Sequence, residues 1–100
     1  MFRLIMVTGE SLSPSYQEGD YVVVATIPFL LQRINAGDII VFRHNTYGMM
    51  IKEVESVDDP EGRVYVVGTN PNSVDSRRFG PIRREDITGK VIWHIPRRRD

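Results

Sequence analysis

The stretch that decides the fold is residues 48–67, GMMIKEVESVDDPEGRVYVV, in which two β-prone runs flank a turn. A glycine opens the run Met49–Val57, residues 58–62 carry the Asp, Pro and Gly of a turn, and Arg63–Val67 is again rich in β-branched residues. We therefore predict a β-hairpin in which successive side chains of each strand alternate between its two faces.

The rest of the chain repeats this construction. A Gly-Asp pair precedes β-branched residues at Gly19–Ala25 and again at Gly37–Arg43, and a last strand is expected at Gly89–Ile95, before a proline. No apolar period of 3.6 residues persists for three turns, so helix is expected only as single turns at Ser13–Gln17 and Arg84–Ile87. The pattern predicts a mainly β protein: one curled antiparallel sheet or partial barrel, forming a single domain over residues 1–100.

Composition excludes several classes of function. The chain has 100 residues, 41% of them hydrophobic, and a net charge of zero, so it can form one core and has no overall field that favours nucleic acid. The absence of cysteine excludes disulfides and thiol catalysis. His44 and His94 show no accompanying pattern of acidic partners and are interpreted as structural or surface residues. We therefore expect no metal and no cofactor.

No apolar run approaches the ~20 residues that span a bilayer, and the first seven residues lack the features of a secretory signal. We expect a soluble, cytoplasmic chain without a transmembrane anchor. The apolar segment Ile27–Leu31 is interrupted by proline and is interpreted as a loop packed on the core. The alternative is an exposed lip that touches substrate or the surface of a membrane, with Phe29 and Leu30 as weak candidates for a substrate rim.

Two short stretches could carry chemistry together. In residues 9–14, GESLSP, a serine lies in a turn closed by a proline, so the Ser11 hydroxyl could be presented rigidly. Lys52 is one of only two lysines and shares a predicted strand face with Met50 and Val54. Desolvation lowers the pKa of an amine, and a neutral lysine can act as the base for a serine nucleophile. The alternatives are an ordinary turn and a lysine whose ammonium group reaches solvent.

A third stretch, residues 68–80, GTNPNSVDSRRFG, is a long polar loop with glycine at both ends. Asp75 and Arg77 could brace this loop as an ion pair, and Ser73 or Ser76 could orient a lysine amine. The alternative is a surface loop that satisfies its own polar groups.

Together these stretches resemble the type I signal peptidase family of Ser/Lys proteases. Its nucleophile loop, Gly-Asp strand, lysine strand and Asp-Ser-Arg loop match, in the same order, Gly9–Pro14, Gly37–Phe42, Lys52–Val54 and Gly68–Gly80. The resemblance covers the chain from about Val7 to Val91. It implies a peptidase whose site residues are the nucleophile Ser11, the general base Lys52, the lysine-orienting Ser73, and Asp75 and Arg77, which hold the loop.

The sequence also departs from the family pattern. The resemblance implies an oxyanion site at the Ser11 N–H, assisted in some members by a hydroxyl at the position of Gly9, which has no side chain to donate. Glu53 and Thr69 replace an arginine and an aspartate, and we hypothesise that a hydrogen bond between them replaces an ion pair.

The chain is shorter than membrane signal peptidases and is similar in form to the compact proteases that mature nickel-type superoxide dismutase. This resemblance implies a serine endopeptidase that removes an N-terminal leader or signal segment from a protein precursor. Two alternatives are a self-cleaving peptidase domain of the repressor type and a non-catalytic module that binds peptides on the same fold. The expected partner is a protein or peptide substrate, with no nucleic acid, and peripheral contact with a membrane stays open.

Overall fold

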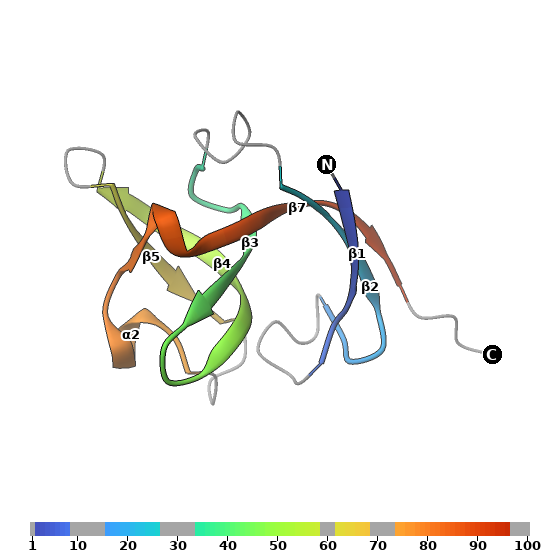
Figure 1. Cartoon of the computed structure of the whole chain (residues 1–100), viewed down its shortest axis with the longest axis horizontal. Coiled ribbons are helices and arrows are strands. Elements are labelled where there is room, and N and C mark those ends of the chain that lie inside the picture. Colours follow the sequence, from blue (N-terminus) through green and yellow to red (C-terminus); the bar gives the residue numbers. More distant parts are fainter. Residues whose placement is uncertain (1, 9–15, 27–33, 59–61, 69–73, 97–100) are drawn as a thin grey trace.

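The protein forms one seven-stranded antiparallel sheet with short helical turns, as the computed structural model shows for residues 2–8, 16–26, 34–58, 62–68 and 74–96 (Figure 1). This confirms the predicted mainly β fold. The strand order is β1-β2-β7-β3-β4-β5-β6. The elements are β1 (Phe2–Met6), β2 (Tyr21–Ala25), β3 (Ile39–His44), β4 (Gly48–Asp58), β5 (Arg63–Val67), α2 (Ser76–Phe79), β6 (Ile82–Arg83), η1 (Arg84–Asp86) and β7 (Ile87–Ile95).

The hairpin predicted from residues 48–67 is β4 and β5. Their pairing runs from Glu53 to Asp58 on β4 and contains an irregularity between Val54 and Ser56. The first half of β4 pairs instead with β3, which places Lys52 opposite Ile40. The long strand β4 therefore joins two parts of the sheet, and Lys52 lies where the pairing changes from β3 to β5.

The helical turn predicted at Arg84–Ile87 is present as η1, but three elements were not foreseen: β1, β6 and the short helix α2. Of the helical turn predicted at Ser13–Gln17, residues 13–15 lie outside the described residues, and Tyr16 and Gln17 are not helical. The segment Ile27–Leu31, including Phe29 and Leu30, also lies outside the described residues.

Strand β7 connects the two halves of the sheet, crossing between them in Figure 1. Its later residues pair with β2 and its earlier residues with β3, with a register irregularity on each side. Gly89 lies close against β2: a Cβ there would collide with the Val24 side chain and approach the carbonyl oxygen of Ala25 to 2.7 Å. A residue without a side chain is therefore required at this point of the curled sheet.

In the described part of the chain, buried side chains form two core clusters. The first core lies among β3, β4, β5, β6 and β7 and consists of Ile34, Ile40, Phe42, Val54, Val64, Val66, Ile82 and Ile87. The second core consists of Val7, Val22, Val24 and Val41, with Ile5, Tyr16, Ile51 and Val91 packed against it. Because alternate residues of β3 and β4 belong to different cores, the side chain of Lys52 lies on the side of the first core and that of Ile51 on the side of the second.

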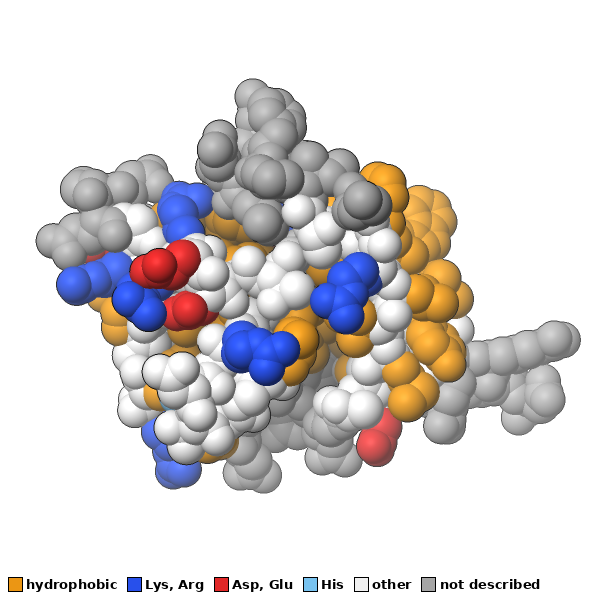
Figure 2. All heavy atoms as spheres, in the orientation of Figure 1, with side chains coloured by type: hydrophobic (Ala, Val, Ile, Leu, Met, Phe, Trp, Pro, Cys, Tyr) orange, Lys and Arg blue, Asp and Glu red, His pale blue; other side chains and the backbone are white. Residues whose placement is uncertain are grey.

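A third group of hydrophobic side chains is exposed. On β1, Phe2, Leu4 and Met6 share one face of the sheet. This face continues across β2 to β7 through cross-strand pairs: Leu4 pairs with Val23, which in turn pairs with Trp93. Leu4 and Trp93 are 62% and 67% exposed. Figure 2 shows hydrophobic side chains gathered at the end of the molecule formed by β1 and β2. We call this surface the apolar face; its exposed members are Phe2, Leu4, Met6, Tyr21, Trp93 and Ile95.

Candidate active site

Lys52 is buried in the middle of β4, with only 1% of its surface exposed. Its neighbours on the same strand face, Met50 and Val54, pack in the first core. Burial lowers the pKa of the Lys52 amine, because a charged ammonium is disfavoured away from water, and the nearby charge of Asp75 offsets only part of this effect. Lys52 is therefore closer to its neutral, proton-accepting form than a surface lysine would be.

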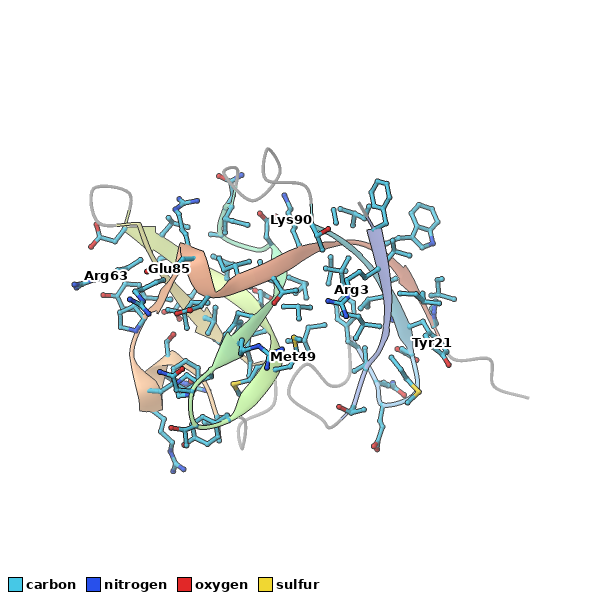
Figure 3. The ribbon with its side chains drawn as sticks, in the orientation of Figure 1. Arg3, Tyr21, Met49, Arg63, Glu85 and Lys90 are labelled. Atoms are coloured by element: carbon cyan, nitrogen blue, oxygen red, sulfur yellow. The ribbon has the colours of Figure 1, made fainter. Side chains whose placement is uncertain are left out.

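The other lysine of the chain has an ordinary environment. Lys90, labelled in Figure 3, extends from β7, and its Nζ lies 3.1 Å from Oδ2 of Asp38, with both side chains 21% exposed. Of the two lysines, Lys52 is the fully buried one, and Lys90 offers a matched control.

Asp75 is a buried carboxylate at the N-terminus of α2. It accepts hydrogen bonds from the N–H groups of Gly68 and Arg77, both at 3.0 Å, and from the Arg77 guanidinium, whose Nε and Nη2 lie 3.0 and 2.8 Å away. Burial alone would raise the pKa of this carboxyl group, but the hydrogen bonds and the charge of Arg77 outweigh it and hold the pKa at about 2. Asp75 is thus an ionised group that ties α2 to the end of β5.

Ser76 adds a second connection between these elements. Its Oγ accepts a hydrogen bond of 2.8 Å from the N–H of Val66 on β5. The second half of the loop at residues 68–80 is therefore fixed to β5 at two points. Ser73, the residue that the family resemblance assigns to orienting the lysine, lies outside the described residues.

The proposed nucleophile, Ser11, and its neighbour Gly9 also lie outside the described residues, but both ends of their segment are described. Val7 and Tyr16 pack in the second core together with Ile51, the residue that precedes Lys52. In the sequence, Ser11 follows Thr8, the last described residue before this segment, by three residues. The described residues on both sides of the serine segment therefore pack in the core cluster that includes Ile51, on the strand face opposite to the Lys52 side chain.

Sequence reasoning missed two contacts near this segment. The sequence showed no pattern of acidic partners for His94, which was interpreted as a structural or surface residue; its Nε2 lies 2.8 Å from Oδ2 of Asp20, 74 residues away in the sequence, as fits a structural role. Glu53 acts on Tyr16, whose pKa is raised first by burial and second by the Glu53 charge. The hypothesised Glu53–Thr69 hydrogen bond involves a residue outside the described ones.

Comparison with known proteins places this arrangement in a family. The Peptidase S24-like family model matches residues 2–92, nearly the whole of the sheet. The chain belongs to the Peptidase S24-like family. This is a family of serine peptidases, and the chain is also similar to signal peptidases.

Two curated relatives extend the comparison. A mitochondrial ATP-independent inner membrane protease subunit 1b of Arabidopsis thaliana is 30% identical over 111 residues, which cover 87% of this chain and 66% of the relative. Signal peptidase I V of Bacillus subtilis is 26% identical over 135 residues, covering 85% of this chain and 80% of the relative. The chain thus spans just under two thirds of the plant protein. Distant homology to signal peptidases agrees with the resemblance found in the sequence motifs.

Two further properties apply to the described part of this S24-like chain. It contains no group of three or more His, Asp or Glu side chains placed to hold a metal ion. None of its helices has the length and apolar composition that a membrane crossing requires.

Proposed function

We propose that the protein is a serine endopeptidase that removes an N-terminal leader from a protein precursor, with Ser11 as nucleophile and Lys52 as general base. The observation that carries this proposal is the burial of Lys52 on β4, which lowers its pKa. Membership of the Peptidase S24-like family supports it, and so does the packing of Val7 and Tyr16, on the two sides of the serine segment, in one core cluster with Ile51.

The proposed reaction has two halves. The neutral Nζ of Lys52 accepts the proton of Ser11 Oγ as this oxygen attacks the scissile carbonyl carbon, and the ammonium then gives that proton to the departing amine. This leaves an ester between Ser11 and the acyl fragment of the substrate. Lys52 next takes a proton from a water molecule that attacks the ester, and Ser11 Oγ regains a proton as the product leaves. The Ser11 N–H would stabilise the oxyanion, without a side-chain donor at Gly9.

Asp75 and Arg77 would support Lys52 by holding the loop beside it. Because Asp75 is ionised at neutral pH, its charge raises the pKa of Lys52 and limits the fall that burial produces. This keeps the amine basic enough to take a proton from a serine hydroxyl. We propose that Ser73 completes this support by a hydrogen bond to the amine.

The substrate is expected to bind as an extended strand. Among the described residues, β5 pairs with β4 from Glu53 to Asp58 and not along the segment 48–52. We propose that the peptide adds beside this segment of β4, where main-chain hydrogen bonds would align its scissile bond with Lys52. Phe29 and Leu30 are proposed to form part of the substrate rim.

A precursor of nickel-type superoxide dismutase is the first substrate to test, on the strength of the sequence resemblance. The two curated relatives, an inner membrane protease subunit and a signal peptidase, favour a leader or signal segment as the general substrate class. Incubation of the protein with such a precursor, followed by mass spectrometry of the products, identifies the bond cut.

A serine-reactive fluorophosphonate tests the enzyme assignment. We expect labelling at Ser11 in the wild type, loss of labelling in Lys52→Met, and unchanged labelling in Lys90→Met. A chain that binds leader peptide without being labelled at Ser11 would instead be a binding module. A chain that is labelled but cuts only its own polypeptide would be a self-cleaving peptidase.

We further propose that the apolar face docks on an anionic membrane surface and that the protein is otherwise cytoplasmic. Monomeric proteins rarely expose a continuous apolar surface of this kind, and the most exposed large side chain in it, Trp93, is of a type enriched at membrane interfaces. The sequence continues two residues after Ile95 with three arginines, at 97–99, whose charge suits anionic lipid.

Vesicle sedimentation tests this surface. The protein should bind vesicles that contain phosphatidylglycerol and not vesicles of phosphatidylcholine alone, and Trp93→Ser should reduce binding. Tyr47→Ser is the matched control, because Tyr47 is an exposed aromatic residue outside the apolar face. A concentration-dependent dimer that Trp93→Ser dissociates, without vesicle binding, would assign the face to self-association instead.

A further inference from the structure

The segment that carries Ser11 leaves the sheet and returns to it at one point. The N–H of Val7 donates to the carbonyl oxygen of Asp20 at 2.7 Å, and the N–H of Gly19 donates to the carbonyl oxygen of Val7 at 2.9 Å. Val7 is also buried in the second core. The end of β1 is thereby tied to the start of β2, on the two sides of the segment that carries Ser11.

The Asp20 carboxylate secures the returning end of this segment. Its side chain is buried, and its Oδ2 accepts a hydrogen bond of 2.9 Å from the N–H of Gln17. The same oxygen lies 2.8 Å from Nε2 of His94 on β7. An ionised carboxylate can only accept, so Nε2 of His94 is the donor. His94 therefore links β7, through Asp20, to a backbone group close to the serine segment.

Tyr16 links the same histidine to the lysine strand. Its ring centroid lies 4.3 Å from that of His94, and it packs in the second core with Ile51. The charge of Glu53 also reaches Tyr16, where it adds to the effect of burial in raising the pKa of the phenol. Ile51 and Glu53 are the residues on either side of Lys52, so Tyr16 lies over this part of β4 on the strand face opposite to the lysine side chain.

We propose that Asp20, His94 and Tyr16 form a positioning clamp, which fixes the described ends of the segment that carries Ser11, at Val7 and Gln17, and thereby sets the rate of Ser11 acylation. The proposal rests on the proposed function of Ser11 and Lys52. These three residues act through this segment and do not contact the reacting atoms. Transfer of a proton and attack on a carbonyl need the groups within about 3–3.5 Å in a defined orientation, and an error of about 1 Å can lower the rate roughly 100-fold. A change in how the clamp holds the ends of the serine segment is therefore expected to change the rate of Ser11 acylation.

Substitutions at His94 separate the hydrogen bond from the ring contact. His94→Ala removes both, whereas His94→Gln keeps a side-chain N–H that can donate to Asp20 and removes the ring. The control is His44→Ala, because His44 also accepts hydrogen bonds from a turn and contacts aromatic rings, but at the β3–β4 turn. Tyr16→Leu tests the second arm of the clamp.

The measurements are the rate of Ser11 labelling by a fluorophosphonate and the Kd of a leader peptide for each variant in a Ser11→Ala background. We expect labelling to slow by about 10- to 100-fold in His94→Ala and by about 10-fold in Tyr16→Leu and His94→Gln, which each remove the ring contact, with His44→Ala within about threefold of wild type. Peptide Kd should stay within about twofold throughout, because the clamp positions the nucleophile and not the substrate. Amide hydrogen exchange at Val7 and Gln17 should accelerate in His94→Ala and be restored in His94→Gln.

Three results would overturn the clamp: wild-type labelling in His94→Ala, unchanged exchange at Gln17 in that variant, or a loss of peptide affinity that matches the loss of labelling. Each of these presupposes that the wild type is labelled at Ser11. A wild type that is not labelled contradicts the proposed function itself, and the clamp falls with it. The two failures are therefore distinguishable from the wild-type control.

Discussion

Asp75 offers the sharpest test of the architecture around Lys52. Its pKa is about 2 in the folded protein, against an ordinary value of 3.8. One pKa unit corresponds to about 1.4 kcal/mol, so the ionised carboxylate stabilises the fold by about 2 kcal/mol at neutral pH. As the pH falls, the unfolded chain takes up this proton first, because its carboxyl group has the higher pKa. The stabilisation is therefore complete above about pH 4 and is lost as the pH falls towards 2.

Asp75→Asn removes this charge and keeps a similar shape. We expect the variant to be less stable than wild type by about 2 kcal/mol at pH 7, with the difference shrinking towards zero near pH 2. Urea denaturation at a series of pH values measures it. Arg78→Gln, which changes an exposed arginine on the same turn of helix, should show no such pH-dependent difference. A difference between wild type and Asp75→Asn that is equal at pH 7 and pH 2.5 would show that ionisation of Asp75 does not stabilise the fold.

Three further results are expected. Lys52→Met should fold, and the free energy of unfolding of wild type should rise relative to that of the variant as the pH rises towards 10.5. The reason is that the buried amine of the folded protein releases its proton at a lower pH than the amine of the unfolded chain does. Urea denaturation between pH 6 and 10 measures this trend, and a difference in stability that stays constant over this range would contradict it. Gly89→Ala should lower stability by about 1–3 kcal/mol in thermal denaturation, because its Cβ would collide with Val24; an unchanged Tm would show that the strands separate easily. Ser76→Ala should cost about 1 kcal/mol through the lost hydrogen bond from the Val66 N–H, and exchange at that amide should accelerate.

The hairpin and most strands could be predicted because their signals are local. A glycine before a β-branched run and a turn rich in Asp, Pro and Gly identify β4 and β5 without reference to the rest of the chain. The face on which Lys52 lies follows from strand alternation alone. Strand β1 was not predicted, although Phe2, Leu4 and Met6 occupy alternate positions. A strand at the edge of a sheet usually carries polar side chains on its outer face, but the outer face of β1 is apolar.

The other features that the sequence did not predict depend on long-range contacts or on elements too short to show a pattern. No local pattern joins His94 to Asp20, because the pairing of β2 with β7 brings them together from opposite ends of the chain. The short helix α2 was also hidden, since four residues give no periodic signal; Asp75 as its N-cap was the available clue. The requirement for glycine at position 89 likewise depends on the crossing of β2 and β7, which the sequence does not display.

The proposed reaction depends most on Lys52 acting as a base with a lowered pKa, and the pH dependence of kcat/KM measures this directly. Activity on a leader peptide should rise with pH on a group whose apparent pKa lies below that of an ordinary lysine. This limb should shift to still lower pH in Asp75→Asn, where the charge that raises the Lys52 pKa is gone, and activity should be absent in Lys52→Met. A limb that stays in place in Asp75→Asn, or activity that survives in Lys52→Met, would contradict the proposed reaction.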